Sequence, residues 1–134
     1  MTTVKQIQAR STPDQIAAGV KWERVKIHHG VLVQEFDQAV IHAFVMLVRD
    51  DGAWGVHARE GGKPGRVVMQ GESVDASAAR RDATLSLLGA CEAAQFFFSG
   101  QQTFNVVSLM KMVDICDETA RIIRNSAINP TDEG

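Results

Sequence analysis

This sequence contains none of the short motifs by which catalytic or nucleotide-binding sites are usually recognised. No serine lies in a G-x-S-x-G motif, and the stretch EGGKPGR has Pro64 where a phosphate-binding loop needs Ser or Thr after its lysine. Cys91 lies in the apolar segment LGACEAA without an adjacent base that would activate its thiol. We therefore expect a protein that is not an enzyme and that binds no cofactor.

Cysteine is scarce, and long hydrophobic runs are absent. The 2 cysteines, Cys91 and Cys116, each lie in a helical pattern without a neighbour at metal-ligand or redox spacing, so we interpret them as buried thiols in a reducing compartment. The segment MTTVKQIQARSTPD lacks the apolar stretch of a secretory signal. The strongest apolar run, residues 43–48, is far shorter than the roughly 20 residues that cross a bilayer. These features predict a cytoplasmic protein without a membrane partner.

Metal binding is not expected, although all 4 histidines fall in the region of predicted strands. The strand pattern places His28 and His29 on opposite faces, and it puts His57 two strands away from His28, roughly 10 Å at the usual strand spacing. Zn–N bonds are about 2.0–2.1 Å long, so ligands this far apart do not share one ion. We predict no metal site.

What the sequence does have is enough apolar surface to fold as one compact domain. With 134 residues and 45 % hydrophobic content, the chain can bury a core without disulfides or metal. Its charge is uneven, since residues 1–66 carry 9 Lys and Arg against 7 Asp and Glu, whereas residues 67–134 carry 5 against 9. We predict a single domain over residues 1–134, with flexible tails at 1–11 and 129–134.

The first half of the chain shows the signals of a short helix and then of a sheet. Ser11 or Thr12 as the cap, Pro13 in the first turn and Gly19 as the stop predict an N-terminal helix. Strand-like alternation between turn residues predicts an antiparallel four-stranded meander, with Gly30 as a bulge. The predicted strands lie within residues 23–36, 40–49, 53–60 and 66–71.

The second half of the chain has the period of helices. Residues 73–98 and 103–127 each carry apolar side chains at steps of three or four, which predicts two long helices. Small residues on the first of them predict that the second packs closely against it. These small residues are Ala79, Ala83, Ala90 and Ala94. The overall prediction is an α+β fold in which this helical hairpin covers one face of the sheet.

The dipeptide Asp51-Gly52 between two apolar strands predicts a two-residue hairpin loop. We therefore interpret Asp50 and Asp51 as turn residues rather than as an acidic site. With this loop, Leu47 lies opposite Val56 and Met46 opposite His57. The resulting register assigns these residues to the face covered by the helices: Val25, Ile27, Val31, Val33, Ile41, Ala43, Val45, Leu47, Trp54, Val56 and Ala58.

The opposite face of the predicted sheet is unusually apolar, because the central strand presents Phe44, Met46 and Val48 there. Apolar patches rimmed by polar groups tend to be interaction sites, so we predict that a second copy or a foreign protein covers this face. The alternative is a cover made by the chain's own N-terminal helix or tail. The predicted protein-binding residues are His28, Leu32, His42, Phe44, Met46, His57 and Arg59.

Such a chain is expected to act as a self-associating structural subunit, or as a small accessory or inhibitory protein of the phage or mobile-element type. Nucleic-acid binding is the alternative function. The order of strands and helix ending in QGESVDASAARRDATLSLL resembles the second half of a double-stranded-RNA-binding domain. In that family a lysine cluster at the start of the last helix contacts phosphates, whereas this sequence has Val74 and Asp75 there. The basic residues that would contact a nucleic acid are Lys26, Arg59, Lys63, Arg66, Arg80 and Arg81.

Overall fold

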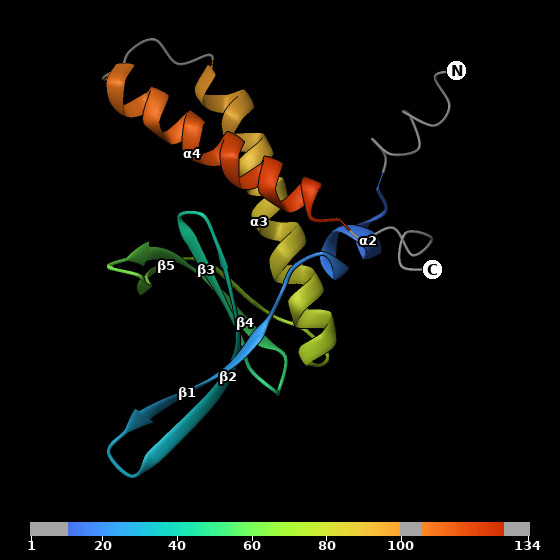
Figure 1. Ribbon diagram of the computed structural model, residues 1–134, viewed down its shortest axis with the longest axis vertical. Coiled ribbons are helices and arrows are strands. Elements are labelled where there is room, and N and C mark those ends of the chain that lie inside the picture. The colour runs from blue at the N-terminus through green and yellow to red at the C-terminus, as the bar shows by residue number, and fades with distance from the viewer. Residues whose placement is uncertain (1–10, 100–105, 128–134) are drawn as a thin grey trace.

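The computed structural model describes residues 11–99 and 106–127, which form one open antiparallel sheet and three helices (Figure 1). The sheet order is β1-β2-β3-β4-β5, so the strands form a meander, and the predicted α+β class is confirmed. The predicted tails lie outside the described residues, apart from Ser11. The elements are α2 (Pro13–Ala18), β1 (Glu23–His29), β2 (Leu32–Ile41), β3 (Phe44–Val48), β4 (Ala53–Glu60), β5 (Lys63–Glu72), α3 (Ala76–Ser99) and α4 (Val106–Asn125).

The short helix α2 forms where the sequence predicts it. Thr12 Oγ1 accepts a hydrogen bond from Gln15 N at 3.2 Å, and Thr12 N donates to Gln15 Oε1 at 2.9 Å, which is a capping box. Ile16 of this helix belongs to the core on the helix side of the sheet, and α2 packs on α3. The alternative in which this helix covers the opposite face of the sheet is therefore wrong.

The predicted number of strands is wrong, since the sheet has five strands rather than four. Residues 23–36 form two strands joined by a tight turn, because His29 pairs with Leu32. Gly30, predicted as a bulge, is the first central residue of this turn and has a φ of +64°. A glycine at that position is typical of one class of two-residue hairpin turn.

A second turn lies at His42 and Ala43, where Ile41 pairs with Phe44. His42 has a φ of 53°, a region that histidine enters more often than most non-glycine residues. Nothing in the apolar run around it signals a turn. The predicted strand over residues 40–49 is consequently divided between β2 and β3.

The loop between β3 and β4 has three residues, Asp50 to Gly52, instead of the predicted two. Arg49 N donates to the carbonyl of Ala53 at 2.8 Å, and Gly52 N donates to the carbonyl of Arg49 at 3.0 Å. Gly52 has a φ of +96°, which suits the last residue of a three-residue hairpin loop. The predicted turn is confirmed at this place, and its length is corrected.

The extra loop residue moves β3 by one position against β4. Met46 pairs with Val56 and both are fully buried on the helix side, whereas Val45 and Leu47 alternate to the other side, the outer face. A shift of one residue exchanges the faces of a strand, so the predicted placement of Phe44 and Met46 on the outer face is wrong. The core comprises Ile16, Ala39, Ile41, Met46, Val56, Ala83, Leu87, Leu88, Cys91, Cys116, Ala120 and Ile123.

Helix α3 packs against β3, β4 and β5, while α4 crosses α3 and contacts the sheet through β2 (Figure 1). The Asp75 carboxylate caps α3 by accepting from Ala78 N at 2.8 Å. Of the predicted small-residue face, Ala79 and Ala83 are buried, whereas Ala90 is exposed. The helical hairpin therefore covers the sheet mainly through α3.

Strand β5 is irregular along its pairing with β4. Val56 pairs with Met69 and His57 pairs with Val67, so Val68 has no partner in the ladder. Such a bulge bends a strand and re-aims its side chains. Val68 is 46 % exposed as a result.

Candidate protein-interaction surfaces

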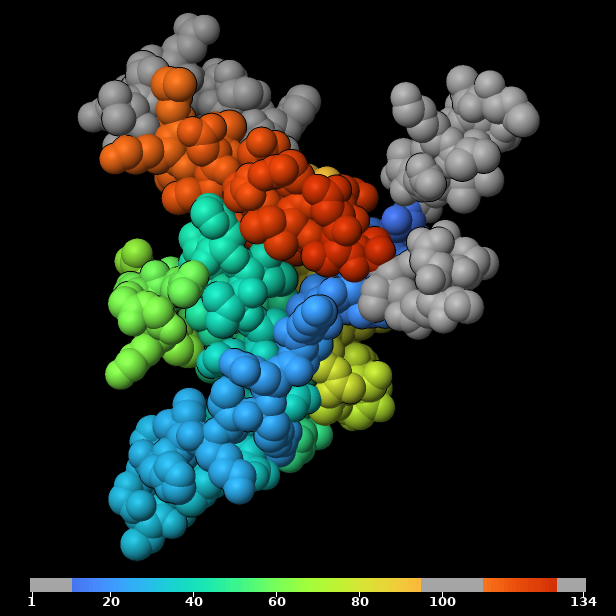
Figure 2. Space-filling model, viewed as in Figure 1, coloured from blue at the N-terminus to red at the C-terminus, as the bar shows by residue number. Residues whose placement is uncertain are grey.

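The β1–β2 hairpin projects from the body of the molecule as an arm (Figures 1 and 2). We define the arm tip as residues 29–33, which contain no Asp, Glu, Lys or Arg. Val31 is 98 % exposed, Leu32 68 % and Val33 49 %. The predicted placement of Val31 and Val33 on the core face is wrong, because the turn at Gly30 carries them away from the helices. The glycine between two alternating runs was the sequence signal for this arm.

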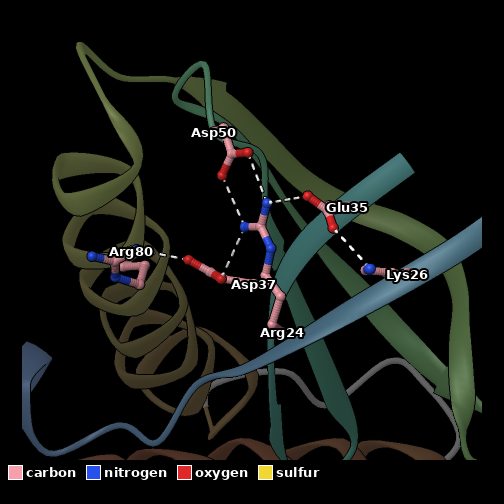
Figure 3. A network of polar contacts seen from close by, with 6 residues as sticks. All are labelled: Arg24, Lys26, Glu35, Asp37, Asp50 and Arg80. Atoms are coloured by element: carbon pink, nitrogen blue, oxygen red, sulfur yellow. Dashed lines mark hydrogen bonds and ion pairs between the residues drawn. The ribbon is translucent and has the colours of Figure 1, made fainter. Parts of the chain in front are cut away.

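Ion pairs at the base of the arm hold it against the body (Figure 3). The Arg24 guanidinium on β1 donates to both oxygens of Asp50, at 2.8 and 2.7 Å, and to Glu35 at 3.1 Å and Asp37 at 3.2 Å on β2. Asp37 also accepts from Arg80 of α3 at 2.7 Å. A bidentate contact between Arg and a carboxylate adds geometric specificity, and the network connects the base of the arm to Asp50 and, through Asp37, to α3.

The network shifts the pKa values of Arg24, Glu35 and Asp50 without creating a reactive acid. The hydrogen bond from Arg24 lowers the pKa of the Asp50 and Glu35 carboxyls, and Asp50 is the main cause that raises the pKa of Arg24. Asp51 accepts from Ala53 N at 3.1 Å, as a turn aspartate does. The two adjacent aspartates thus have structural contacts, and sequence reasoning did not predict their ion pairs, Asp50 with Arg24 and Asp51 with Arg49.

A groove of about 260 Å³ opens between the sheet and the two long helices. It is lined by Phe44, Val68, Met69, Leu87, Ala90, Cys91, Ala94, Met112 and Cys116, and we call it the helix–sheet groove. None of these side chains is that of Asp, Glu, Lys or Arg. Val68 and Met112 are 46 % and 48 % exposed, so apolar surface is open to solvent there. Val68 reaches the groove because of the bulge in β5.

Both cysteines line this groove from the two long helices and are buried free thiols. Burial raises the pKa of Cys91 to about 12 and also raises the pKa of Cys116. A thiol acts as a nucleophile only after deprotonation. The geometry agrees with the interpretation of buried thiols and offers no support for cysteine catalysis.

The outer face of the sheet is apolar, as predicted, but different residues form it. Val45 and Leu47 take the places expected for Phe44 and Met46, and they are 0 % and 8 % exposed. Val40, which pairs with Val45, is 44 % exposed, and Val67 on β5 is 46 % exposed. Because Val45 and Leu47 at the centre of this face are already buried, the face offers less free apolar surface than the arm tip.

The predicted protein-binding residues do not form one surface. His28 and Leu32 both lie on the exposed arm, although on opposite faces of it, since His28 pairs with Val33. Phe44 lines the helix–sheet groove, whereas Met46 is fully buried. The structure thus leaves the arm and the groove as separate candidate surfaces and removes Met46 from any surface.

The other three predicted residues gather near the β2–β3 turn. His42 is exposed in that turn, and its carbonyl accepts a hydrogen bond from Arg59 Nη1 at 3.3 Å. His57 is half-buried, with Nδ1 3.0 Å from the carbonyl oxygen of Gly65. These contacts are structural ones within the sheet.

The basic residues of the nucleic-acid alternative are dispersed over β1, β4, β5 and α3. Three of them lie beside carboxylates: Lys26 beside Glu35 at 3.5 Å, Arg80 beside Asp37 at 2.7 Å, and Arg81 beside Asp14 at 3.0 Å. Lys63 and Arg66 are exposed at one end of β5. Neighbouring carboxylates thus offset the charge of three of the six predicted residues, which weakens their attraction to phosphates.

Within residues 11–99 and 106–127, no three His, Cys, Asp or Glu side chains come together as a metal site. No helix of the described chain has the length and apolarity needed to span a membrane. The chain matches no known protein-family model, no curated protein and no solved structure.

Proposed function

We propose that this chain is a non-enzymatic protein-interaction module that docks through the tip of its β1–β2 arm. The observation that carries the proposal is the exposure of Val31 and Leu32, 98 % and 68 %, at the end of a projecting hairpin. Exposed apolar surface is unfavourable in water by about 25 cal/mol per Å². Clustered at a tip, it favours a partner that removes it from solvent.

The fixed base of the arm supports the same proposal. Arg24 holds the arm through Asp50 and Asp37, and Asp37 connects it to Arg80 of α3. An arm with a set direction loses less conformational freedom on binding than a mobile loop does. This arrangement suits a cytoplasmic structural subunit and equally a small accessory protein of the phage or mobile-element type.

Charge substitution at the tip tests this function. Leu32→Asp should abolish binding to the protein partners that copurify with the tagged chain. It should also abolish self-association of the chain, because a carboxylate is costly to bury in an apolar site. Val74→Asp is the matched control, since Val74 is 91 % exposed and lies between β5 and α3. Circular dichroism should show both variants folded, and an unchanged partner profile for Leu32→Asp would refute the proposal.

A further inference from the structure

Resting on the proposed function, we infer that the arm tip of one copy inserts into the helix–sheet groove of another, so that copies assemble head to tail. The two surfaces are both apolar and both exposed in the single chain. The tip, residues 29–33, and the groove lining both lack carboxylate, ammonium and guanidinium groups. Assembly through these surfaces therefore buries no carboxylate, ammonium or guanidinium group without a partner.

The sizes of the two surfaces also correspond. An apolar cavity of about 150 Å³ accepts a benzene molecule, so a groove of about 260 Å³ has room for a leucine and a valine side chain together. Leu32 and Val31 are the most exposed pair at the tip. The groove in turn offers Met112, whose unbranched side chain adapts to the shape of its neighbours.

The tip and the groove of one molecule cannot meet each other. The arm tip and the crossing of α3 with α4 lie toward opposite ends of the molecule (Figure 1). In agreement with this, Val31 and Leu32 on one surface and Val68 and Met112 on the other all remain exposed within the single chain. A contact between two different surfaces of identical chains is heterologous, and repetition of it produces a ring or an open filament.

The test uses one variant for each surface. Leu32→Asp disables the tip, and Ala90→Glu blocks the groove from an exposed position of α3. Alanine and glutamate both favour helices, so the substitution at position 90 should preserve α3. Ala93→Glu is the control on the same helix, because Ala93 is exposed but does not line the groove. In sedimentation velocity, Leu32→Asp and Ala90→Glu should each lower the association constant by about tenfold or more, whereas Ala93→Glu assembles as the wild type does.

Mixing the two disabled variants gives the decisive measurement. Leu32→Asp keeps an intact groove and Ala90→Glu keeps an intact tip, so an equimolar mixture should form a dimer of twice the monomer mass and nothing larger. If thermal melting shows that Ala90→Glu does not fold, Met112→Glu replaces it, since the Met112 residue is 48 % exposed.

The other outcomes separate this inference from the proposed function. If Leu32→Asp abolishes assembly but Ala90→Glu leaves it intact, the copies contact each other through their two tips. A wild type that stays monomeric at every concentration, yet loses a foreign partner through Leu32→Asp, would mean that the groove of another copy is not the receptor. Both outcomes overturn the head-to-tail inference and leave the proposed interaction function standing. If Leu32→Asp changes neither assembly nor partner binding, the inference and the proposed function are both overturned.

Discussion

Replacing Gly52 by alanine should destabilise the fold more than the same change at any of the other hairpin glycines. Gly52 has a φ of +96°, and a side chain in left-handed backbone costs about 1–2 kcal/mol. In addition, a Cβ at this position would lie 2.1 Å from the backbone carbonyl oxygen of Ser73, which cannot rotate away as a side chain can. Overpacking of this kind costs about 1–3 kcal/mol. The expected total of about 2–5 kcal/mol is a large part of the 5–15 kcal/mol by which a typical domain is stable.

Gly62→Ala is the matched control for Gly52→Ala. Gly62 also lies in a hairpin turn with positive φ, +78°, but nothing lies within 4 Å of an added Cβ. Urea denaturation followed by circular dichroism should therefore give a loss of about 1–2 kcal/mol for Gly62→Ala and clearly more for Gly52→Ala. Equal losses for the two variants would refute the close approach of the β3–β4 loop to Ser73, whose N–H donates to the Gly52 carbonyl at 2.9 Å.

Three further changes test other parts of the structure. Met46→Glu should unfold the chain, because the Met46 side chain is fully buried. Val40→Glu should leave the protein folded, because Val40 is 44 % exposed, and far-UV circular dichroism distinguishes the two outcomes. Asp50→Asn should destabilise the protein near neutral pH. Because the hydrogen bond from Arg24 lowers the folded-state pKa of Asp50, the difference from wild type should vanish only when the pH falls through that lowered value, as urea titrations at successive pH values would show. Cys91, with its pKa raised to about 12 by burial, should react with iodoacetamide at neutral pH far more slowly in the folded than in the urea-unfolded chain, and equal rates would contradict its burial.

Several features of the candidate surfaces were within reach of sequence reasoning, and others were not. Leu32 and His28 were predicted as binding residues and do lie on the exposed arm. The exposure of Val31, Val68 and Met112 was not predicted, because it follows from a turn, a bulge and a helix crossing. Apolar residues at strand or helix spacing are ordinarily buried, so periodicity alone assigns them to the core.

The sequence by itself determined the kinds of element and the places where α2 and α3 begin. The helix cap at Thr12 and the turn at Gly52 act through backbone hydrogen bonds and dihedral angles of adjacent residues, and such local interactions can be read from local sequence. Only the tertiary structure decided which face of β3 meets the helices. That choice depends on whether the loop between β3 and β4 has two or three residues. The third residue is Asp50, which accepts hydrogen bonds from Arg24 on β1, two strands away from β3 in the sheet. Because a strand alternates with a period of two, this single residue exchanges Met46 with Val45, and no local pattern distinguishes two apolar neighbours.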